Sequence, residues 1–454
     1  MPINQTGTHM DTAAHEYRDE WQEVPLASVA DIRFSSVNKV SQPGEQPVRL
    51  CNYTDVYKND YITADMDFMR ATATRSEIER FVLQVGDVII TKDSETPDDI
   101  GIPSVVDTTA PDVVCGYHLA LLRPNQAEVD PTFLAKQLAH HRIARYFGQQ
   151  ANGSTRYSLS TAAIANAPLH LPRPENQRSA SILMRLVDTH ITQTEAVTAK
   201  LKQVRAGMLH DLLSYGLDEN GQLRDPIAHP EQFKDSPLGR IPRAWNICTL
   251  TDLGIGKLVN GVFKEPKRVG NGVPLVNVAD LYRGESIELD GCERFSATPA
   301  EIARYRVLQG DIFFTRSSLK LEGIAQTSFM ASDPGDAVFE CHVMRLMPNP
   351  EKIVPRFLKE WCVGHYARRH FMANAKQVTM TTISQEGIQR LNCPQPPLAE
   401  QIEAVCKIET MDGLLAVELD LAQKLKYEKQ ALQDDLLTGR VPVPKTIVEG
   451  AAAA

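Results

Sequence analysis

The sequence predicts an α+β fold in which two mixed domains follow one another along the chain and each ends in a long helix. Three observations carry this prediction. Residues 175–215 and 399–437 are similar to each other and contain no internal proline, as expected of long helices. Identical residues in the two halves stand 224 positions apart, and this offset persists over about 190 residues, from Trp21/Trp245 onward. Short apolar segments typical of strands precede each helix. A period this long indicates duplicated domains rather than a solenoid.

Each long segment carries a narrow apolar row at helical spacing. The expected seam consists of Leu183, Val187, Val197, Leu201, Val204 and Met208 in the first segment, and of Leu414, Val417, Leu421, Leu425 and Leu432 in the second. Such a row favours pairing of the two helices, whereas two ordinary amphipathic helices within one core are the alternative. About 37 residues at 1.5 Å each span about 55 Å, more than a typical domain helix. We therefore expect the helices to act as spacers.

Strand and turn signals recur ahead of each helix. Residues 82–92 and 307–316 are expected to form β-hairpins that turn at Gly86 and Gly310, each followed by an aspartate. Glycine permits positive φ at such turns, and aspartate can bond its own backbone.

Further elements are expected beyond these turns. Residues 113–123 and 338–347 are expected to contain strands, and Pro131 and Pro355 are expected to begin helices, where a missing N–H costs nothing. The boundaries that follow are an N-terminal extension 1–20, a first domain 21–174, a first helix 175–215, a loop-like connector 216–244, a second domain 245–397, a second helix 398–440 and a tail 441–454.

Length and composition limit the class of protein. A chain of 454 residues predicts about two to four domains. Hydrophobic residues make up 43% and charged residues 23%, as in folded soluble proteins. The sequence contains no run of about 18 apolar residues, and residues 1–20 have no apolar core, so we expect no membrane span and no signal peptide. The eight cysteines are scattered without a Cys-x-x-Cys pair, so reduced thiols and a cytoplasmic location are expected.

The net charge of −9 argues mildly against a nucleic-acid ligand, but the cations are unevenly placed. Residues 131–174 and 361–385 contain no acid. The cations of these segments are Lys136, Arg142, Arg145, Arg156 and Arg173 in the first, and Arg368, Arg369 and Lys376 in the second; a further group is Lys257, Lys264, Lys267 and Arg268, opposed by Glu265. Local basic surfaces on an acidic chain suit contact with DNA on one side and with protein partners elsewhere. An ordinary solvated face is the alternative for each group.

Several motifs together make the chain similar to a known family. They are NGQLRDP and HPEQFKDSPLGRIPRAW in the connector, GDVIITK and GDIFFTR at the turns, GSTRYSLSTAAIANAPLHLP ahead of the first helix, and DDLLTGRV at the end of the second. On these motifs the chain, from Trp21 to Val443, resembles the specificity subunit of type I restriction-modification enzymes. The second domain departs from the pattern, with KQVTMTTIS in place of GSTRYSLS.

The resemblance implies an architecture, partners and a cellular context. Two target-recognition domains each read one half of a split sequence in double-stranded DNA, and an antiparallel coiled coil of the two helices sets the gap. The subunit itself is not catalytic and holds no cofactor. The implied partners are two modification subunits, which carry S-adenosylmethionine and methylate adenine, and restriction subunits, which translocate and cut DNA in a prokaryotic cytoplasm.

Within this resemblance, two groups of residues are expected to contact DNA. Lys92 and Arg316 follow the Gly-Asp turns at equal positions, and Ser94 and Ser318 lie just beyond. The second group, in an exposed loop just before a strand, comprises Arg156, Tyr157, Lys376 and Gln377. Lys and Arg position phosphates and, with polar side chains, read base edges. Charged strand ends without a DNA role are the alternative for Lys92 and Arg316.

Other functional classes have weaker support. A methyltransferase acting alone needs a glycine-rich cofactor loop and an Asp/Asn-Pro-Pro-aromatic segment, and neither occurs. Cys362 and His365, together with His370, could suggest zinc, but a helix face explains them better. His118 and His342 recur at equal positions, which favours packing or hydrogen bonding over catalysis. A stand-alone DNA-binding protein and a coiled-coil scaffold without methyltransferase partners are the remaining alternatives.

Overall fold

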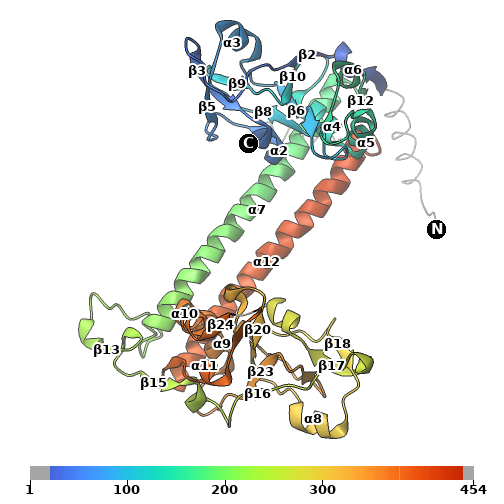
Figure 1. The fold of residues 1–454 in the computed structure, drawn as a ribbon. Helices are drawn as coiled ribbons and strands as arrows, with labels where there is room; N and C mark the ends of the chain where they lie inside the picture. The colour runs from blue at the N-terminus through green and yellow to red at the C-terminus, as the bar shows by residue number, and fades with distance from the viewer. Residues whose placement is uncertain (1–20, 378, 443–454) are drawn as a thin grey trace, which may run out of the picture. The chain divides into compact units, whose positions relative to one another are not determined.

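The computed structural model describes residues 21–377 and 379–442 (Figure 1). The predicted extension 1–20 and residues 443–454 of the predicted tail lie outside the described residues. By its contacts the chain divides into two compact units, Met1–Glu195 with Asp420–Ala454, and Ala196–Leu419. The boundaries predicted from the repeat give each long helix a segment of its own, whereas the contacts divide each long helix between the two units.

The first unit contains a mixed domain with two principal sheets. The larger has the strand order β2-β10-β6-β8-β4 and the smaller has the order β5-β3-β9, while β1 pairs with β12 and β7 with β11. The strands are β1 Gln22–Pro25, β2 Ala30–Phe34, β3 Gln46–Cys51, β4 Tyr61–Ile62, β5 Met69–Ala73, β6 Val88–Thr91, β7 Asp93–Ser94, β8 Pro103–Val106, β9 Val113–Cys115, β10 Leu119–Pro124, β11 Tyr157–Ser158 and β12 Pro168–Leu171. The short helices are η1 Leu26–Ser28, α2 Tyr53–Lys58, α3 Arg75–Phe81, α4 Pro131–Ala139, α5 His141–Gln150 and α6 Thr161–Ala165.

The second unit contains the duplicated domain. Its sheets have the strand orders β16-β23-β19-β21, β18-β17-β22 and β20-β25-β24, with the pairs β13-β14 and β15-β26. The strands are β13 Phe233–Ser236, β14 Gly239–Pro242, β15 Asn246–Thr249, β16 Val259–Asn260, β17 Val269–Val276, β18 Glu293–Phe295, β19 Ile312–Thr315, β20 Ser317–Ser318, β21 Thr327–Phe329, β22 Val338–Phe339, β23 Val343–Leu346, β24 Ala375–Gln377, β25 Thr381–Ile383 and β26 Asn392–Gln395. The short helices are η2 Pro230–Gln232, η3 Leu250–Leu253, η4 Pro266–Arg268, η5 Val278–Tyr282, η6 Leu321–Gly323, α8 Pro299–Tyr305, α9 Pro355–Val363, α10 His365–Ala373 and α11 Gln385–Gln389.

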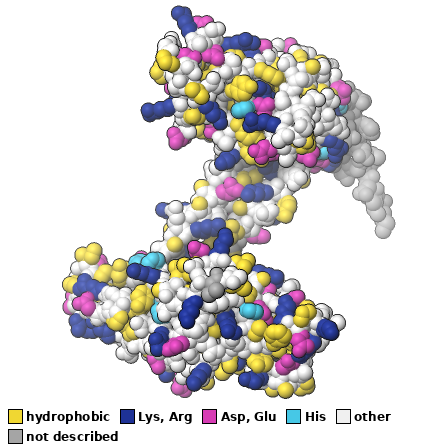
Figure 2. Space-filling view, in the orientation of Figure 1, with side chains coloured by type: hydrophobic (Ala, Val, Ile, Leu, Met, Phe, Trp, Pro, Cys, Tyr) yellow, Lys and Arg dark blue, Asp and Glu magenta, His cyan; other side chains and the backbone are white. Residues whose placement is uncertain are grey.

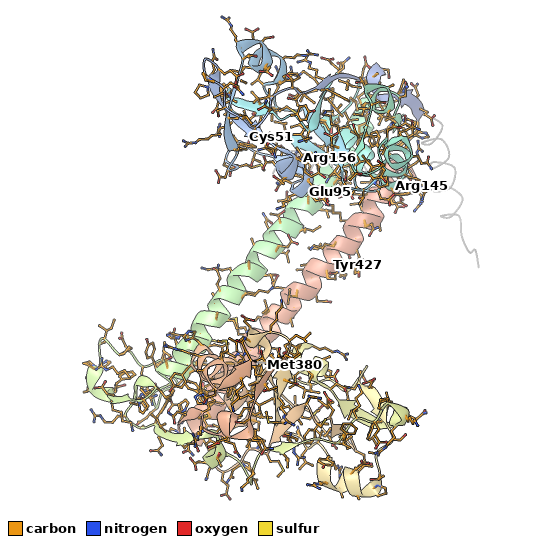
Figure 3. All side chains as sticks on the ribbon, in the orientation of Figure 1. Cys51, Glu95, Arg145, Arg156, Met380 and Tyr427 are labelled. Carbon is orange, nitrogen blue, oxygen red and sulfur yellow. The ribbon has the colours of Figure 1, made fainter. Side chains whose placement is uncertain are left out.

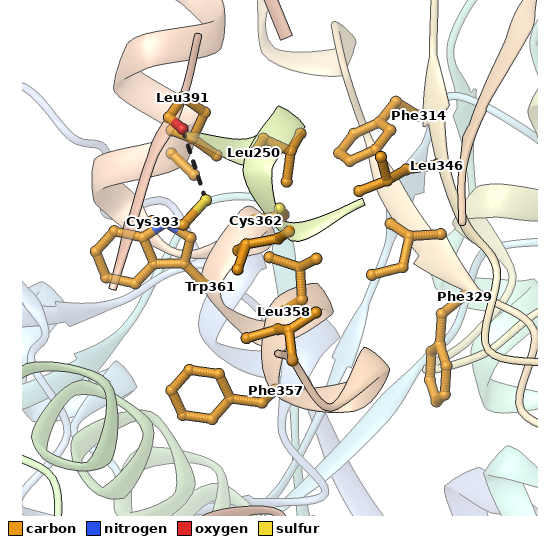
Figure 4. Close-up of a cluster of buried hydrophobic side chains, with 14 of the residues drawn as sticks. Leu250, Phe314, Phe329, Leu346, Phe357, Leu358, Trp361, Cys362, Leu391 and Cys393 are labelled. Carbon is orange, nitrogen blue, oxygen red and sulfur yellow. Dashed lines mark hydrogen bonds between the residues drawn. The ribbon is translucent and has the colours of Figure 1, made fainter. Parts of the chain in front are cut away.

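The central strand of each domain separates two apolar clusters. In β19, Ile312 and Phe314 belong to one cluster with Phe357, whereas Phe313 belongs to another with Phe339. Successive side chains of a strand point to opposite faces, which explains the uninterrupted apolar sequence. Figure 4 shows the cluster around Phe314 and Phe357. Each such buried phenylalanine contributes about 2–3 kcal/mol of transfer free energy. The predicted α+β class with a duplicated domain is confirmed.

The expected Gly-Asp turns exist, but the hairpins do not. Gly86 and Gly310 have φ of 88° and 87°. In the second unit Asp311 accepts the Leu308 N–H at 2.8 Å, as expected for an aspartate that bonds its own backbone. The strand that follows each turn pairs with later strands instead, β6 with β8 and β10, and β19 with β21 and β23. The hairpin prediction is therefore wrong, because apolar alternation identifies a strand without identifying its partner.

The two long helices are α7, Pro174–Ser214, and α12, Leu398–Leu437. Among the described residues, no helix is apolar enough over a sufficient length to cross a membrane. Within each unit a part of α7 runs beside a part of α12 in the opposite direction (Figure 1). In the first unit Lys426 pairs with Glu195 at 2.6 Å and Lys429 with Asp188 at 2.8 Å. In the second unit Arg205 pairs with Asp412. As residue numbers rise along one helix they fall along the other.

Charged clusters hold these helix segments to the domains. In the first unit Lys136, 7% exposed, contacts Asp188 at 2.8 Å and Asp60 at 2.7 Å. Lys429 of α12 also reaches Asp60, at 3.2 Å. Burial alone would raise the pKa of the Asp60 carboxyl, but the two ammonium groups hold that pKa below its ordinary value. The carboxylate therefore stays ionised between two cations.

The second unit repeats this arrangement with different side chains. The Glu285 carboxylate forms ion pairs with Lys359 at 2.7 Å, Arg356 at 3.1 Å and Arg205 at 3.3 Å. Burial again opposes ionisation of Glu285, and these cations, Lys359 above all, lower its pKa. Arg356 also contacts Asp412 at 2.6 Å.

The helix interface differs from the predicted seam. Five of its expected members are exposed by 41–66%: Val197, Val204, Leu414, Val417 and Leu421. The inward positions on α7 include Met184, Asp188, Ile191 and Thr198, mostly one residue further along. One residue rotates a helix face by about 100°. The prediction is wrong for these five positions, whereas Leu183, Met208 and Leu432 are partly buried against the apolar clusters. It followed apolar residues alone, whereas polar side chains in charged clusters occupy part of the interface.

A buried glutamine fixes the start of each long helix. The Gln177 amide, 1% exposed, accepts the Asp130 N–H at 2.9 Å and donates to the carbonyls of Glu128 and Pro172 at 3.1 and 2.8 Å. Gln401, 0% exposed, makes the same three types of bond, to Val354, Lys352 and Pro396. Each amide therefore joins the helix to the loop that precedes α4 or α9 and to the exit from the domain.

A tryptophan meets a glycine where each helix ends. A Cβ on Gly216 would lie 2.4 Å from Cζ2 of Trp245, and a Cβ on Gly439 would lie 2.7 Å from Cε2 of Trp21. Both glycines also have positive φ, 62° and 66°. Only glycine fits such a position without displacement of the ring.

The connector 216–244 is more ordered than the expected loop. It contains the β13–β14 hairpin and buries Leu217, Phe233 and Ile241. Its Arg224 pairs with Glu400 at 2.6 Å. The Gly- and Pro-rich composition that suggested a loop reflects its turns, since Gly239 has φ of 88°.

We expect Gln177→Ala to lower the free energy of unfolding by about 2 kcal/mol, because it leaves a buried N–H and two carbonyls without their partner. Gln401→Ala should have a similar effect. Urea unfolding followed by circular dichroism measures the change, with Gln193→Ala, at an exposed position of α7, as the control. Equal midpoints for Gln177→Ala and the control would contradict the anchoring role.

Candidate nucleic-acid interface

In the first unit, several of the predicted residues surround one hollow. Strand β7 pairs with β11 so that Ser94 lies opposite Tyr157. The hollow beside this pair has a volume of about 420 Å³. It is lined by Lys39, Tyr53, Thr54, Asp93, Ser94, Glu95, Thr96, Asp99, His118 and Arg156. Figure 3 labels Glu95 and Arg156 on this unit. Arg156 is exposed in the loop directly before β11, as predicted.

Lys92 is enclosed rather than presented to this hollow. Its side chain is 12% exposed and lies 3.8 Å from Asp93. The ammonium group stands over two aromatic rings, 4.7 Å from the centroid of Tyr117 and 5.3 Å from that of Phe34. Cation–π contacts of this kind hold a lysine in place. Ser94 lines the hollow but is only 6% exposed.

Acidic and aromatic side chains line the hollow, among them Asp99 and Tyr53, and the predicted site residues did not include them. Tyr57 donates to Asp99 at 2.9 Å, and this bond raises the pKa of the Tyr57 hydroxyl. Burial, then the nearby Asp99, raises the pKa of Tyr53. Carboxylates accept hydrogen bonds from the amino groups of cytosine and adenine. The excess of acids over residues 93–112 was the available signal, although the tyrosines come from another segment.

In the second unit the predicted residues meet on a three-stranded sheet. Strand β25 pairs with both β20 and β24, so Thr382 lies between Ser317 and Lys376. In the next row Thr381 lies between Ser318 and Gln377. Lys376 and Gln377 thus belong to strand β24, and their prediction as loop residues is wrong. The apolar pattern was too short to identify this strand.

A second hollow, of about 660 Å³, lies against this sheet. It is lined by Lys257, Asn260, Arg316, Asn374, Lys376, Thr382, Ile383, Ser384, Gln385, Glu386 and Gln389. Arg316 is exposed, and its side chain has no hydrogen-bond or ion-pair partner among the described residues. Met380 holds the repeat position of Arg156 and is 41% exposed (Figure 3). Different positions of the repeat therefore line the two hollows: Arg156 but not Lys92 lines the first, and Arg316 but not Met380 lines the second.

The paired histidines have matching hydrogen bonds, as the sequence suggested. His118 Nδ1 lies 2.8 Å from Asp93, and His342 Nδ1 lies 3.0 Å from the Ser317 hydroxyl. Asp93 and Ser317 are themselves at equivalent positions of the repeat. Each histidine thereby ties its strand to the segment that follows Lys92 or Arg316.

Several cations of the predicted basic surfaces have structural partners. Lys136 is buried between carboxylates, Lys264 pairs with Glu293, and Arg268 with Glu301. Arg368 donates to the carbonyls of Ile324 and Glu322 at 2.6 and 2.7 Å. Figure 2 shows cationic and anionic side chains interspersed on the visible face of each unit. Runs without acids in the sequence were misleading because their partners come from distant segments.

Cys362 and His365 do not form the zinc pair considered above. Cys362 is fully buried in the cluster of Figure 4, and burial raises the pKa of its thiol. His370, the third residue considered with them, meets the Gly387 carbonyl at 2.9 Å. The groups of converging metal ligands among the described residues include none of these side chains.

Two domains of one fold, each with a polar hollow beside the short sheet that follows its Gly-Asp turn and each followed by a long helix, define a class of duplicated α+β proteins. The family model for the type I restriction modification DNA specificity domain matches residues 18–203. The specificity subunit assigned to the MjaX type I restriction enzyme of Methanocaldococcus jannaschii is 20% identical over 383 residues, 81% of each chain. The MjaVIII specificity subunit of the same organism is 21% identical and covers 66% of this chain and 68% of its own.

A solved structure has the same fold. The S subunit of the type I restriction-modification system from M. genitalium has a TM-score of 0.54 at 13% identity, covering 92% of this chain and 96% of its own. The chain is thus similar over most of its length to type I restriction enzyme specificity subunits, and residues 18–203 match the specificity domain of that family.

The buried Asp311 carboxyl, in the turn before the strand that leads to Arg316, should make the stability of the chain depend on pH. Burial raises the pKa of Asp311 from 3.8 to about 6, although the Leu308 N–H and Arg345, 3.5 Å away, both act to lower it. Between these two values the folded chain keeps a proton that the unfolded chain has lost. The free energy of unfolding contributed by Asp311 is therefore fully present below pH 3.8 and falls as the pH rises through about 6.

We expect Asp311→Asn, which removes this titration, to lack that fall. Thermal unfolding midpoints measured from about pH 4 to 7 should show the wild type losing stability relative to the variant as the pH rises. Asp333→Asn, at an exposed position, should follow the wild type. Parallel curves for the wild type and Asp311→Asn would contradict the shift.

Proposed function

We propose that this chain directs a type I restriction-modification complex to a split sequence in double-stranded DNA. Each domain reads one half-sequence through the hollow beside β7–β11 or β20–β25–β24. The observation that carries the proposal is that each domain has a polar hollow beside the short sheet that follows its Gly-Asp turn and strand, although different positions of the repeat line the two hollows. A duplicated reader whose hollows differ in chemistry suits a target with two different halves.

The chemistry of the hollows supports reading of base edges as well as phosphates. Arg316 and Lys376 in the second hollow can donate to the O6 and N7 acceptors of guanine or to phosphate oxygens. Asp99 and Glu95 in the first hollow can accept from base amino groups, and Arg156 can donate beside them. Lys92, held over two rings, supports the site rather than contacting bases.

The helices α7 and α12 are proposed to set the gap between the two half-sequences. Their lengths of 41 and 40 residues correspond to about 60 Å each. The antiparallel ion pairs within each unit support this role, because they fix how the two helices run together.

The same helices offer docking surfaces for the modification subunits. Large apolar side chains remain more than 40% exposed on both helices: Leu186, Val197 and Val204 on α7, and Ile402, Leu414, Val417, Leu419, Leu421 and Tyr427 on α12. Exposed apolar surface in this quantity favours protein contact. S-adenosylmethionine then belongs to the modification subunits, which methylate adenine, and restriction subunits complete the nuclease. We expect the purified chain alone to transfer no methyl group.

We expect Arg316→Ala to weaken binding of the assembled methyltransferase to its target by about 1–3 kcal/mol if the guanidinium reads a base, and to relax specificity at one position. If it contacts a phosphate, affinity for target and scrambled DNA should fall together, and the salt slope should decrease by about 1. Fluorescence anisotropy at two salt concentrations separates the two cases. Arg304→Ala, on the exposed face of α8, is the matched control. Unchanged affinity under all conditions would remove Arg316 from the site.

The spacer role predicts the effect of shortening both helices in register. Deletion of residues 192–198 with 420–426 removes facing segments, because Glu195 pairs with Lys426 and both deletions contain seven residues. The gap should shorten by about 10 Å, close to three base pairs, and the faces should rotate by about 100° around the duplex. Activity should fall sharply, and any residual methylation should fall on the same half-sequences at a shorter gap.

Genome-wide mapping of methylated adenines measures this outcome. Deletion from α7 alone breaks the register and serves as the control for a general loss of folding. Altered half-sequences with an unchanged gap would show that the helices are not the spacer.

A further inference from the structure

Three side chains with metal-binding atoms converge in the first unit, away from the hollow of the recognition site. His140 and His141 lie at the junction of α4 and α5, and Asp434 lies in the last turn of α12. Two carry imidazole nitrogens and one carries a carboxylate. Their ligand atoms all lie within 4.8 Å of one another.

The separations suit a single small ion. His140 Nε2 lies 3.1 Å from Asp434 Oδ1, and His141 Nδ1 lies 3.9 Å from the same oxygen. Two ligands bound to tetrahedral zinc at about 2.0–2.1 Å lie about 3.3 Å apart. Rotation of the exposed His141 ring, whose side chain is 66% exposed, can bring the third atom to this separation. The His140 side chain, 10% exposed, is already held in place.

The surroundings orient the carboxylate and leave room for solvent. Arg440 contacts Asp434 Oδ2 at 2.9 Å, so Oδ1 is the oxygen turned toward the histidines. An outer partner of this kind fixes the orientation of a metal-binding carboxylate. The ligands line a hollow of about 610 Å³, together with Lys136 and Tyr427, which Figure 3 labels on α12. The charge of Lys136 is already matched by Asp188 and Asp60.

We propose that His140, His141 and Asp434 form a binding site for a divalent transition-metal ion of the zinc class, completed by water from the hollow. Imidazole nitrogen and carboxylate oxygen are the ligands that such ions take, whereas Mg²⁺ prefers oxygen ligands alone. The ion ties the junction of α4 and α5 to the end of α12, adding a strong link where His140 and Asp434 now share one hydrogen bond. The site has a structural role and is independent of DNA reading.

The repeat provides an internal comparison. The positions equivalent to His140, His141 and Asp434 in the second unit are Gly364, His365 and His210. That place lines a hollow of its own, but it keeps only two imidazoles and has no carboxylate at the third position. The groups of three converging ligands among the described residues do not include it. We therefore expect no metal ion at this equivalent place in the second unit.

The experiment uses the untagged full chain, stripped with a chelator and titrated with zinc chloride in a calorimeter. We expect one saturable equivalent, and a rise in the thermal unfolding midpoint with zinc because the ion binds the folded state. His140→Asn and Asp434→Asn should each weaken zinc binding at least tenfold, and Arg440→Ala should weaken it by about tenfold through lost orientation of the carboxylate. His365→Asn should bind zinc as the wild type does. Magnesium chloride should give no comparable heat.

Cobalt(II) absorption adds a second measurement that is independent of stability. Tetrahedral coordination should give intense visible bands that disappear in His141→Asn, a variant at an exposed position that is expected to fold normally. Circular dichroism confirms folding of each variant. Absence of saturable zinc binding to the wild type, or equal zinc affinity in the wild type, His140→Asn and His141→Asn, would overturn the proposal.

Discussion

The structure depends on keeping two long helices in register against domains to which charged clusters, as well as apolar side chains, hold them. Asp188 and Asp412 occupy equivalent positions, and each receives a cation from the opposite helix, Lys429 or Arg205. A carboxylate withdrawn from water is tolerated only where its cation meets it. A slip by one helical turn would separate both pairs. These pairs therefore constrain register more narrowly than apolar side chains, which can pack against many neighbours.

Sequence periodicity predicted which segments form helices and strands better than it predicted which of these elements pair or pack with one another. The duplication, the helices beginning at Pro131 and Pro355 and the two long helices were all visible, because each depends on local spacing. The hairpins were wrong because strand partners lie far apart in sequence. The seam was misplaced by one residue at most positions, because a row of valines and leucines says nothing about carboxylates such as Asp188 that cations draw into the interface.

The candidate site was predictable in place but not in composition. Each hollow lies beside the short sheet that follows the Gly-Asp turn and its strand, which is where the sequence placed the candidate residues. It could not reveal that Lys92 would be held by Tyr117 and Phe34, or that Tyr53 would line the first hollow, because these residues come from separate segments. The second hollow was predicted more closely, since Arg316 and Lys376 line the same surface. The charge of a short sequence segment is a poor guide to the charge of a surface, because acids from distant parts of the sequence can pair with its cations.

The tryptophan–glycine contacts have a consequence for the connectivity of the fold. Trp245 and Gly216 are joined by the ordered connector, whereas Trp21 and Gly439 stand far apart along the chain, yet both pairs make the same close contact within their units. The end of each long helix is thus held by the fit of a tryptophan ring against a glycine. This contact forms whether or not a short chain segment joins the two residues. Each unit therefore completes this contact with its own tryptophan and glycine, whether the two residues are close in the sequence or far apart.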